Sequence, residues 1–201
     1  MTLFGRIGCI AALLVTMATA VAAQTYPKAT GYVNDFAHLL TKEQGAALNQ
    51  ELVDFEKKTT LEIAVVTVPS LGGVSIERFT QGLANEWGVG KKGENNGIVF
   101  LVAPTERTMR IEVASGARAL FSNAAADRVR DDAVLPRFRA RDMPGGIVDG
   151  THAIMRTVER ALSREGNDVA PALQSAQAES DSFDFRWVLV IFGGIIVMVG
   201  G

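Results

Sequence analysis

Apolar residues are concentrated at the two ends of this 201-residue chain, and this uneven distribution most constrains what the chain can form. Residues 1–23 are mostly hydrophobic and carry a single charge, Arg6, while residues 187–201 are mostly hydrophobic and carry none. All of the acidic residues, and all of the basic residues except Arg6, lie between these ends. The section 24–186 is therefore less hydrophobic and more charged than the chain as a whole. That is the composition of an ordinary globular domain, so disorder, collagen-like repeats, a polytopic membrane protein and a disulfide-stapled miniprotein are excluded.

The segment 1–23 is typical of a secretory signal peptide. Arg6 supplies the positive charge, residues 7–17 the apolar stretch, and Ala20 to Ala23 a small-residue cleavage site. An uncleaved anchor helix is the alternative. Cleavage would remove Cys9, the single cysteine, and with it any disulfide or thiolate chemistry. We therefore expect export, with the domain on the extracytoplasmic (periplasmic) side of the cell membrane.

The C-terminal segment 187–201 is an apolar run that begins with Trp187. As a helix, this segment would extend about 22 Å against a hydrocarbon core of about 30 Å. We expect a short transmembrane helix, either incomplete in this chain or marginal, although a buried core helix is the alternative. Residues 163–186 are rich in Ser, Ala, Gln, Asp and Glu and predict a flexible linker. The folded domain is then residues 28–162.

Hydrophobic periodicity within that domain predicts alternating helices and strands. A capping box formed by Thr41 and Gln44 begins a helix over residues 41–58. Further elements are expected as strand 62–68, a helix from Ser75 to Trp87, strands 98–103 and 109–113, a helix through 126–133 that ends near Pro136, and a helix over 147–161. This order predicts an α/β fold in which helices sandwich a small mixed sheet.

Several function classes are unsupported by the motifs. Residues 88–93 match G-x-G-x-x-G, but a helix is predicted before them and a strand after them, the reverse of a dinucleotide site, so no nicotinamide cofactor is expected. His38 and His152 have no partner at zinc-ligand spacing, and there is no G-x-S-x-G motif of a serine hydrolase. The formal net charge of −2 argues against nucleic-acid binding.

Charged residues in predicted loops are the remaining candidates for chemistry. Asp35 precedes the first helix and Asp142 precedes the last, where their oxygens suit calcium or another divalent cation. Alternatively, each aspartate caps a helix or closes a turn. The arginines of residues 128–141 are interspersed with aspartates and form either a compensated surface or a docking site for phosphate or an anionic lipid headgroup.

Six segments, taken in order, resemble the TPM domain over roughly residues 28–160. They are residues 31–35 (GYVND) with Leu39-Leu40, 63–68 (IAVVTV), 87–90 (WGVG) with Gly93, 96–97 (NG), 110–113 (RIEV) and 136–139 (PRFR). The resemblance implies a three-layer α/β/α sandwich, and bacterial members similarly carry a signal peptide and a C-terminal transmembrane helix. Some members are described as acid phosphatases or divalent-metal binders, and others as accessory factors for membrane protein complexes.

This sequence departs from the family pattern at three acidic positions. Asn95 stands in place of the acidic residue before Asn-Gly, Arg118 in place of a glutamate, and Asn123 in place of an aspartate. Asn can still ligate calcium through its amide oxygen, but it attracts the ion less than a carboxylate does. We therefore expect a non-catalytic accessory or quality-control factor.

The alternative is a divalent-metal-dependent acid phosphatase. In that hypothesis Asp35, Asn95 and Asp142 would hold the cation, which is calcium or another divalent ion. Arg110 and Arg139 would bind the anionic phosphate group.

Overall fold

A computed structural model of the chain describes residues 25–91 and 93–181, with side chains described as far as Arg164. In chain order, the elements are β1 (Val33–Asp35), α1 (Lys42–Thr59), β2 (Glu62–Thr67), α2 (Ile76–Trp87), β3 (Gly97–Ala103), β4 (Thr108–Val113), the 3₁₀ turn η2 (Ser115–Ala117), α3 (Asn123–Val129), the π-helical turn η3 (Arg130–Val134), α4 (Leu135–Arg139) and α5 (Met143–Asp181). The predicted signal peptide and transmembrane helix lie outside the described residues. Among the residues that are described, no helix combines the length and apolarity needed to cross a membrane.

The strands form one four-stranded mixed sheet in the order β1-β2-β3-β4. β1, β2 and β3 are parallel, and β4 runs antiparallel to β3 after the tight turn at residues 104–107. The predicted α/β fold with a small mixed sheet is confirmed. β1 itself was not predicted, because so short a strand at a sheet edge cannot show a period.

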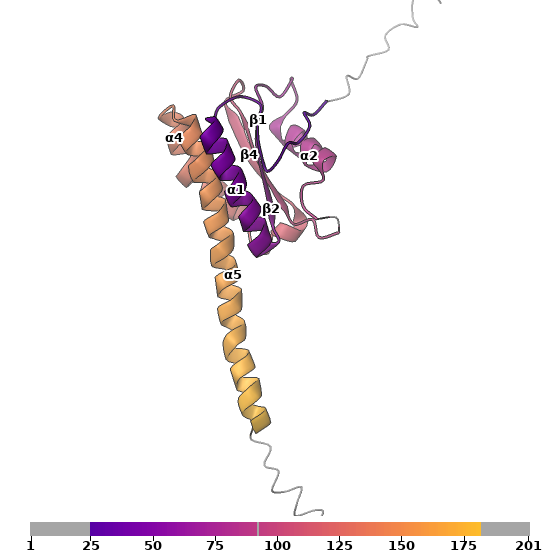
Figure 1. The fold of residues 1–201 in the computed structure, drawn as a ribbon, viewed down its shortest axis with the longest axis vertical. Coiled ribbons are helices and arrows are strands. Elements are labelled where there is room, and N and C mark those ends of the chain that lie inside the picture. Colours follow the sequence, from indigo (N-terminus) through magenta and orange to yellow (C-terminus); the bar gives the residue numbers. More distant parts are fainter. Residues whose placement is uncertain (1–24, 92, 182–201) are drawn as a thin grey trace, which may run out of the picture.

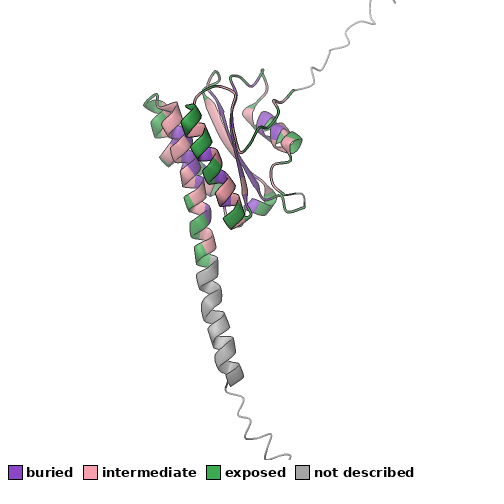
Figure 2. Ribbon diagram, viewed as in Figure 1, coloured by how far each residue is buried: buried purple, intermediate pink, exposed green. Residues whose placement is uncertain are grey.

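Helices cover both faces of this sheet (Figures 1 and 2). Side chains alternate between the faces along each strand, so Val65 and Phe100 point to one core and Val66 and Leu101 to the other. The first core contains Leu48, Leu52 and Phe55 of α1 together with residues of α3 and α5. The second contains Phe79 and Leu83 of α2. The wholly apolar β3 is buried at every residue because both of its faces are covered.

The connections between the parallel strands have an uncommon geometry. β1, β2 and β3 follow one another across the sheet, yet the connecting helices α1 and α2 pack on opposite faces. Two connections that step in the same direction but cross opposite faces have opposite hands. One of them is therefore left-handed, whereas about 98% of such crossovers in proteins are right-handed.

The helix predicted to end near Pro136 continues past it. α3 passes through the π-helical turn η3 into α4, which ends at Arg139. Pro136 lies in the first turn of α4, where its missing N–H is tolerated and where the wider π turn absorbs the change in hydrogen bonding. The helical stretch therefore ends three residues after Pro136, near the position that the sequence predicted.

The last helix is much longer than predicted. α5 begins at Met143 rather than at residue 147 and runs for 39 residues, projecting well beyond the sheet (Figure 1). Residues 163–181 are therefore helical where we expected a flexible linker. The composition that suggested a linker also contains the strong helix formers Ala, Gln and Glu, so composition alone did not distinguish a linker from a helix.

Candidate functional site

Asp35 lies at the carboxyl end of β1, and its carboxylate is used by the local backbone. Its Oδ1 accepts a hydrogen bond from the Leu39 N–H at 3.0 Å, and its Oδ2 accepts one from the Leu40 N–H at 2.8 Å. The hydroxyl of Thr67, on the neighbouring strand β2, also donates to Oδ1. Asp35 thus fastens the turn before α1 to the sheet, which is the local turn role left open by the sequence.

Asp142 also acts on its own chain segment. Its Oδ1 accepts a hydrogen bond from the Gly145 N–H at 2.9 Å, the geometry of an N-cap for α5. Its Oδ2 pairs with Arg137 at 3.1 Å, and the same guanidinium contacts Asp149 at 2.7 Å. The carboxylate therefore ties the end of α4 to the first turns of α5.

Asn95 lies at the other end of the sheet from Asp35. Strand register places Asp35 level with Val102, five residues along β3 from Gly97, or about 17 Å. Asn95 precedes Gly97 at the amino end of β3, in the left-handed region with φ of 49°. The structure therefore does not bring Asn95 and Asp35 to one cation.

The structure instead brings Asn95 together with Arg118. Both line a hollow of about 310 Å³ between α2, the start of β3 and the turn after β4. The Gly116 N–H donates to the Asn95 carbonyl at 2.9 Å, and a Cβ at Gly116 would lie 1.9 Å from the Glu94 carbonyl oxygen. Only glycine permits this close approach of the two loops. Asn123, at the start of α3, does not line the hollow.

Two polar side chains shape the loop that borders this hollow. Glu62 accepts a hydrogen bond from the Gly90 N–H at 2.8 Å, and Asn96 accepts one from the Lys91 N–H at 2.7 Å. Asn96 also donates to the Thr60 carbonyl at 2.5 Å. Burial raises the pKa of the Glu62 carboxyl, and the hydrogen bond from Gly90 opposes that effect. The described residues of the G-x-G-x-x-G segment thus lie in the connection between α2 and β3.

The hollow is poorly equipped to bind a cation. Glu112 contributes the one carboxylate among its described lining residues, and Arg110 holds that carboxylate through Nη2 at 2.6 Å and Nε at 2.7 Å. Arg118 adds a positive charge to the same wall. Across residues 25–164, leaving aside Lys92, no three His, Cys, Asp or Glu side chains are grouped in a way that could hold a metal ion.

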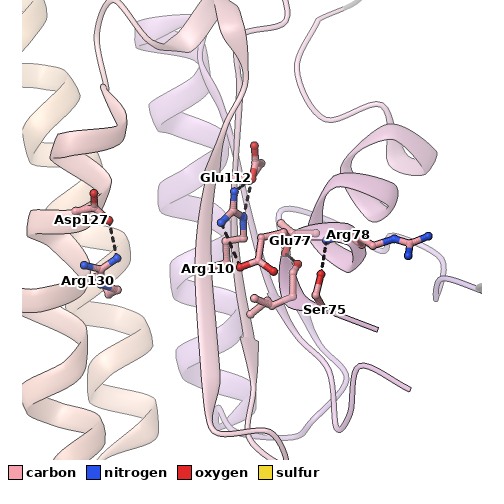
Figure 3. A network of polar contacts seen from close by, with 9 residues as sticks. Ser75, Glu77, Arg78, Arg110, Glu112, Asp127 and Arg130 are labelled. Carbon is pink, nitrogen blue, oxygen red and sulfur yellow. Dashed lines mark hydrogen bonds and ion pairs between the residues drawn. The ribbon is translucent and has the colours of Figure 1, made fainter. Parts of the chain in front are cut away.

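The two predicted anion-binding arginines lie on different elements. Arg110 is on β4 and also contacts Glu77 of α2 at 3.7 Å, so two carboxylates offset its charge (Figure 3). Arg139 is exposed in the last turn of α4. The pKa of the Asp131 carboxyl is lowered mainly by its hydrogen bond with Arg130, and the charge of Arg139 lowers it further. Neither arginine lines the hollow that contains Asn95 and Arg118.

A second, larger hollow was not predicted from the sequence. It has a volume of about 470 Å³, lies between α3 and α5, and is lined by Arg128, Arg156, Arg160 and Arg164. The four-residue spacing of the three α5 arginines was visible in the sequence. Their meeting with Arg128 depends on the packing of α3 against α5, which no local pattern reveals.

Comparisons with known proteins agree with this architecture. A family model described as the TPM domain matches residues 33–157. The N-terminal domain of a protein from P. gingivalis is similar, with 31% identity and a TM-score of 0.62 over 67% of this chain and 85% of that one. The N-terminal domain of the cg2496 protein from Corynebacterium glutamicum shares the fold, with 19% identity and a TM-score of 0.52 over 70% of this chain and 88% of that one.

The BA42 protein from the psychrophilic bacterium Bizionia argentinensis also shares the fold. Its identity is 22% and its TM-score 0.53, over 61% of this chain and 83% of that one. No protein of curated function matches the chain significantly.

Proposed function

This chain belongs to the TPM domain family, and from that membership we propose that it is a non-catalytic accessory or quality-control factor for membrane protein complexes. In this proposal residues 1–23 direct export, and residues 187–201 anchor the protein in the cell membrane. The domain then lies on the periplasmic side. The long projecting helix α5 supports this arrangement, since it leads from the domain toward the apolar C-terminal segment.

The observation that carries the proposal is the chemistry of the hollow that contains Asn95 and Arg118. Two positions that are acidic in the family pattern meet there as an amide and a guanidinium. Calcium and magnesium require several converging oxygens, preferably from carboxylates. The positive charge of Arg118, in the same lining as the one described carboxylate, Glu112, repels such an ion.

The other two predicted ligands support the same conclusion. Asp35 accepts three hydrogen bonds from its own fold, and Asp142 caps α5 and pairs with Arg137. A cation at either site would have to displace contacts that hold helices in place. Among the described residues, therefore, no specific contact favours the phosphatase alternative.

Calorimetric titration of the full chain in detergent with calcium, magnesium or zinc tests the non-catalytic assignment. We expect no saturable binding by the natural chain. The double variant Asn95→Asp/Arg118→Glu restores two family carboxylates and should gain calcium binding, whereas the matched control Arg118→Ala should not. Saturable binding by the natural chain, or hydrolysis of a phosphate ester that a chelator abolishes, would overturn the assignment.

The accessory role has its own test. Chemical crosslinking in intact cells, followed by purification of the full chain, should recover the same membrane protein complex in independent experiments. Failure to recover any reproducible membrane partner would refute the accessory role, whatever the outcome of the metal titration.

A further inference from the structure

The hollow between α3 and α5 forms a groove with strong positive charge, called here the arginine groove. Its charged lining is Arg128 from α3, Arg156, Arg160 and Arg164 from α5, and a single acid, Asp132. The side chains between these charges are mostly small, among them Ala119, Ala125, Ala133, Ala153 and Ala161. Small side chains permit the backbone of another helix to approach closely, so the groove has the form of a helix-binding surface.

Among the side chains that the structure describes, the four guanidinium groups of the groove have no carboxylate partner. In residues 25–164, Lys92 excepted, none of them lies within 4.0 Å of a carboxylate oxygen. Some other arginines of the domain are paired, whereas exposed arginines such as Arg78 and Arg107 resemble those of the groove in having no carboxylate partner among the described residues. Arg130 binds Asp127 and Asp131, and Arg137 binds Asp142 and Asp149. The arginine groove is therefore a surface whose positive charge the described domain does not neutralise.

The spacing of the α5 arginines defines what would complement them. Arg156, Arg160 and Arg164 follow one another at four-residue steps and thus lie on one side of α5 over about 12 Å. Like charges at this spacing destabilise a helix. Carboxylates repeated at the same spacing on an opposing helix would face all three guanidinium groups and replace this repulsion with charge-assisted hydrogen bonds.

A lipid surface fits the groove less well than a protein does. α5 continues beyond Arg164 as far as Asp181, before the apolar segment that we expect to enter the bilayer. That length of helix is about 26 Å. Electrostatic attraction to headgroups is screened over about 8 Å at physiological ionic strength, so the groove lies beyond its reach along the helix.

We propose that the arginine groove docks a helix of a protein partner that carries aspartate or glutamate side chains at four-residue spacing. The inference rests on the accessory role proposed above and identifies the surface that performs it. Arg128 approaches the groove from α3 and the other three arginines approach it from α5, so a docked helix would be contacted from both helices.

Fluorescence anisotropy of a labelled alanine-based helix with glutamates at four-residue spacing tests the groove directly on the full chain in detergent. We expect saturable binding that weakens as salt is raised, and at least a tenfold loss in Arg156→Glu/Arg160→Glu. Both positions are exposed, and Arg156→Ala/Arg160→Ala provides a milder variant that should also lose affinity. Arg78→Glu reverses a single charge on α2, across the sheet from the groove, and should bind like the natural chain.

Three results would each overturn the groove assignment. The first is a natural chain that does not bind the peptide, the second is an isomeric peptide with scattered glutamates that binds as tightly, and the third is an Arg78→Glu variant that loses as much affinity as the groove variant. Stronger arginine-dependent binding to phosphatidylglycerol vesicles would assign the groove to lipid, and competition by inorganic pyrophosphate at concentrations below those of the peptide would assign it to a small anion.

Crosslinking in cells separates failure of the groove from failure of the accessory role. If the natural chain and Arg156→Glu/Arg160→Glu recover the same membrane partner equally, the accessory role stands and the groove is wrong. If the natural chain recovers none, the accessory role fails. Loss of that partner in the groove variant alone supports both.

Discussion

Replacing Asp35 with alanine should destabilise the folded domain without affecting metal binding. The carboxylate accepts hydrogen bonds from the Leu39 and Leu40 N–H groups and from the Thr67 hydroxyl. These three contacts join the end of β1, the turn before α1 and the neighbouring strand β2. Alanine leaves all three donors without their partner, and Thr67 is almost completely buried, at 1% exposure.

The size of the effect follows from these contacts. A hydrogen bond to a charged group contributes about 1.5–3 kcal/mol in proteins. Leu39 and Leu40 are only partly buried, so water recovers much of what their N–H groups lose. We therefore expect Asp35→Ala to lower the free energy of unfolding by about 3 kcal/mol. Asp35→Asn retains one acceptor oxygen and should lose less, about 1–2 kcal/mol.

Urea unfolding followed by circular dichroism measures this change, and a double-mutant cycle assigns it. Thr67→Val removes the hydroxyl while preserving the shape of the side chain. The double variant Asp35→Ala/Thr67→Val should be more stable than the sum of the single losses predicts, by about 1 kcal/mol. An Asp35→Ala protein as stable as the natural chain, but with reduced calcium affinity, would refute the reasoning and restore Asp35 as a metal ligand.

Three further changes test the local energetics. The hydrogen bond to Glu56 and burial together raise the pKa of Tyr32 to about 12. The stabilisation that protonated Tyr32 gives the folded domain should persist below pH 10 and disappear as pH rises through 12. Tyr32→Phe should remove the corresponding transition from an ultraviolet titration of the two tyrosines. Because burial raises the pKa of Glu62, the native state holds that proton more tightly than the unfolded chain. Unfolding free energy should therefore fall as pH rises from 4.5 through the raised pKa, and Glu62→Gln should abolish this fall. Gly45→Ala, in the interior of α1 with open space around its Cβ, should raise the unfolding free energy by about 0.5–1 kcal/mol in urea titrations.

The elements that the sequence predicted well have strong local signals. The capping box of Thr41 and Gln44 forms as expected at the start of α1, and the apolar runs of β2 and β3 are buried strands. Differences from the predictions arise where tertiary packing overrides the local pattern. The helix end that was expected near Pro136 lies three residues later, at Arg139, because the π turn before the proline accommodates its ring. The right-handed crossover rule would place α1 and α2 on the same face of the sheet, and the structure departs from it.

The candidate site was predictable only in part. The turn and cap roles of Asp35 and Asp142 follow from their positions before helices, and the structure places both in those roles. The meeting of Asn95 with Arg118 could not be predicted, because it requires the loop before β3 to contact the turn after β4 at Gly116. Such a contact between segments far apart in the chain leaves no periodic trace in the sequence.

The charge at the hollow of Asn95 and Arg118 and at the arginine groove favours an anionic ligand over a cation. Arg118 stands beside the single carboxylate of one hollow, and the other is lined by four arginines and one aspartate. Arginines with a purely structural role, such as Arg137, are held by carboxylates of the same domain. The repulsion along Arg156 and Arg160 has no such compensation among the described residues, and a bound cation would increase it. A bound carboxylate would convert the repulsion into attraction, so we expect an acidic partner to stabilise this domain.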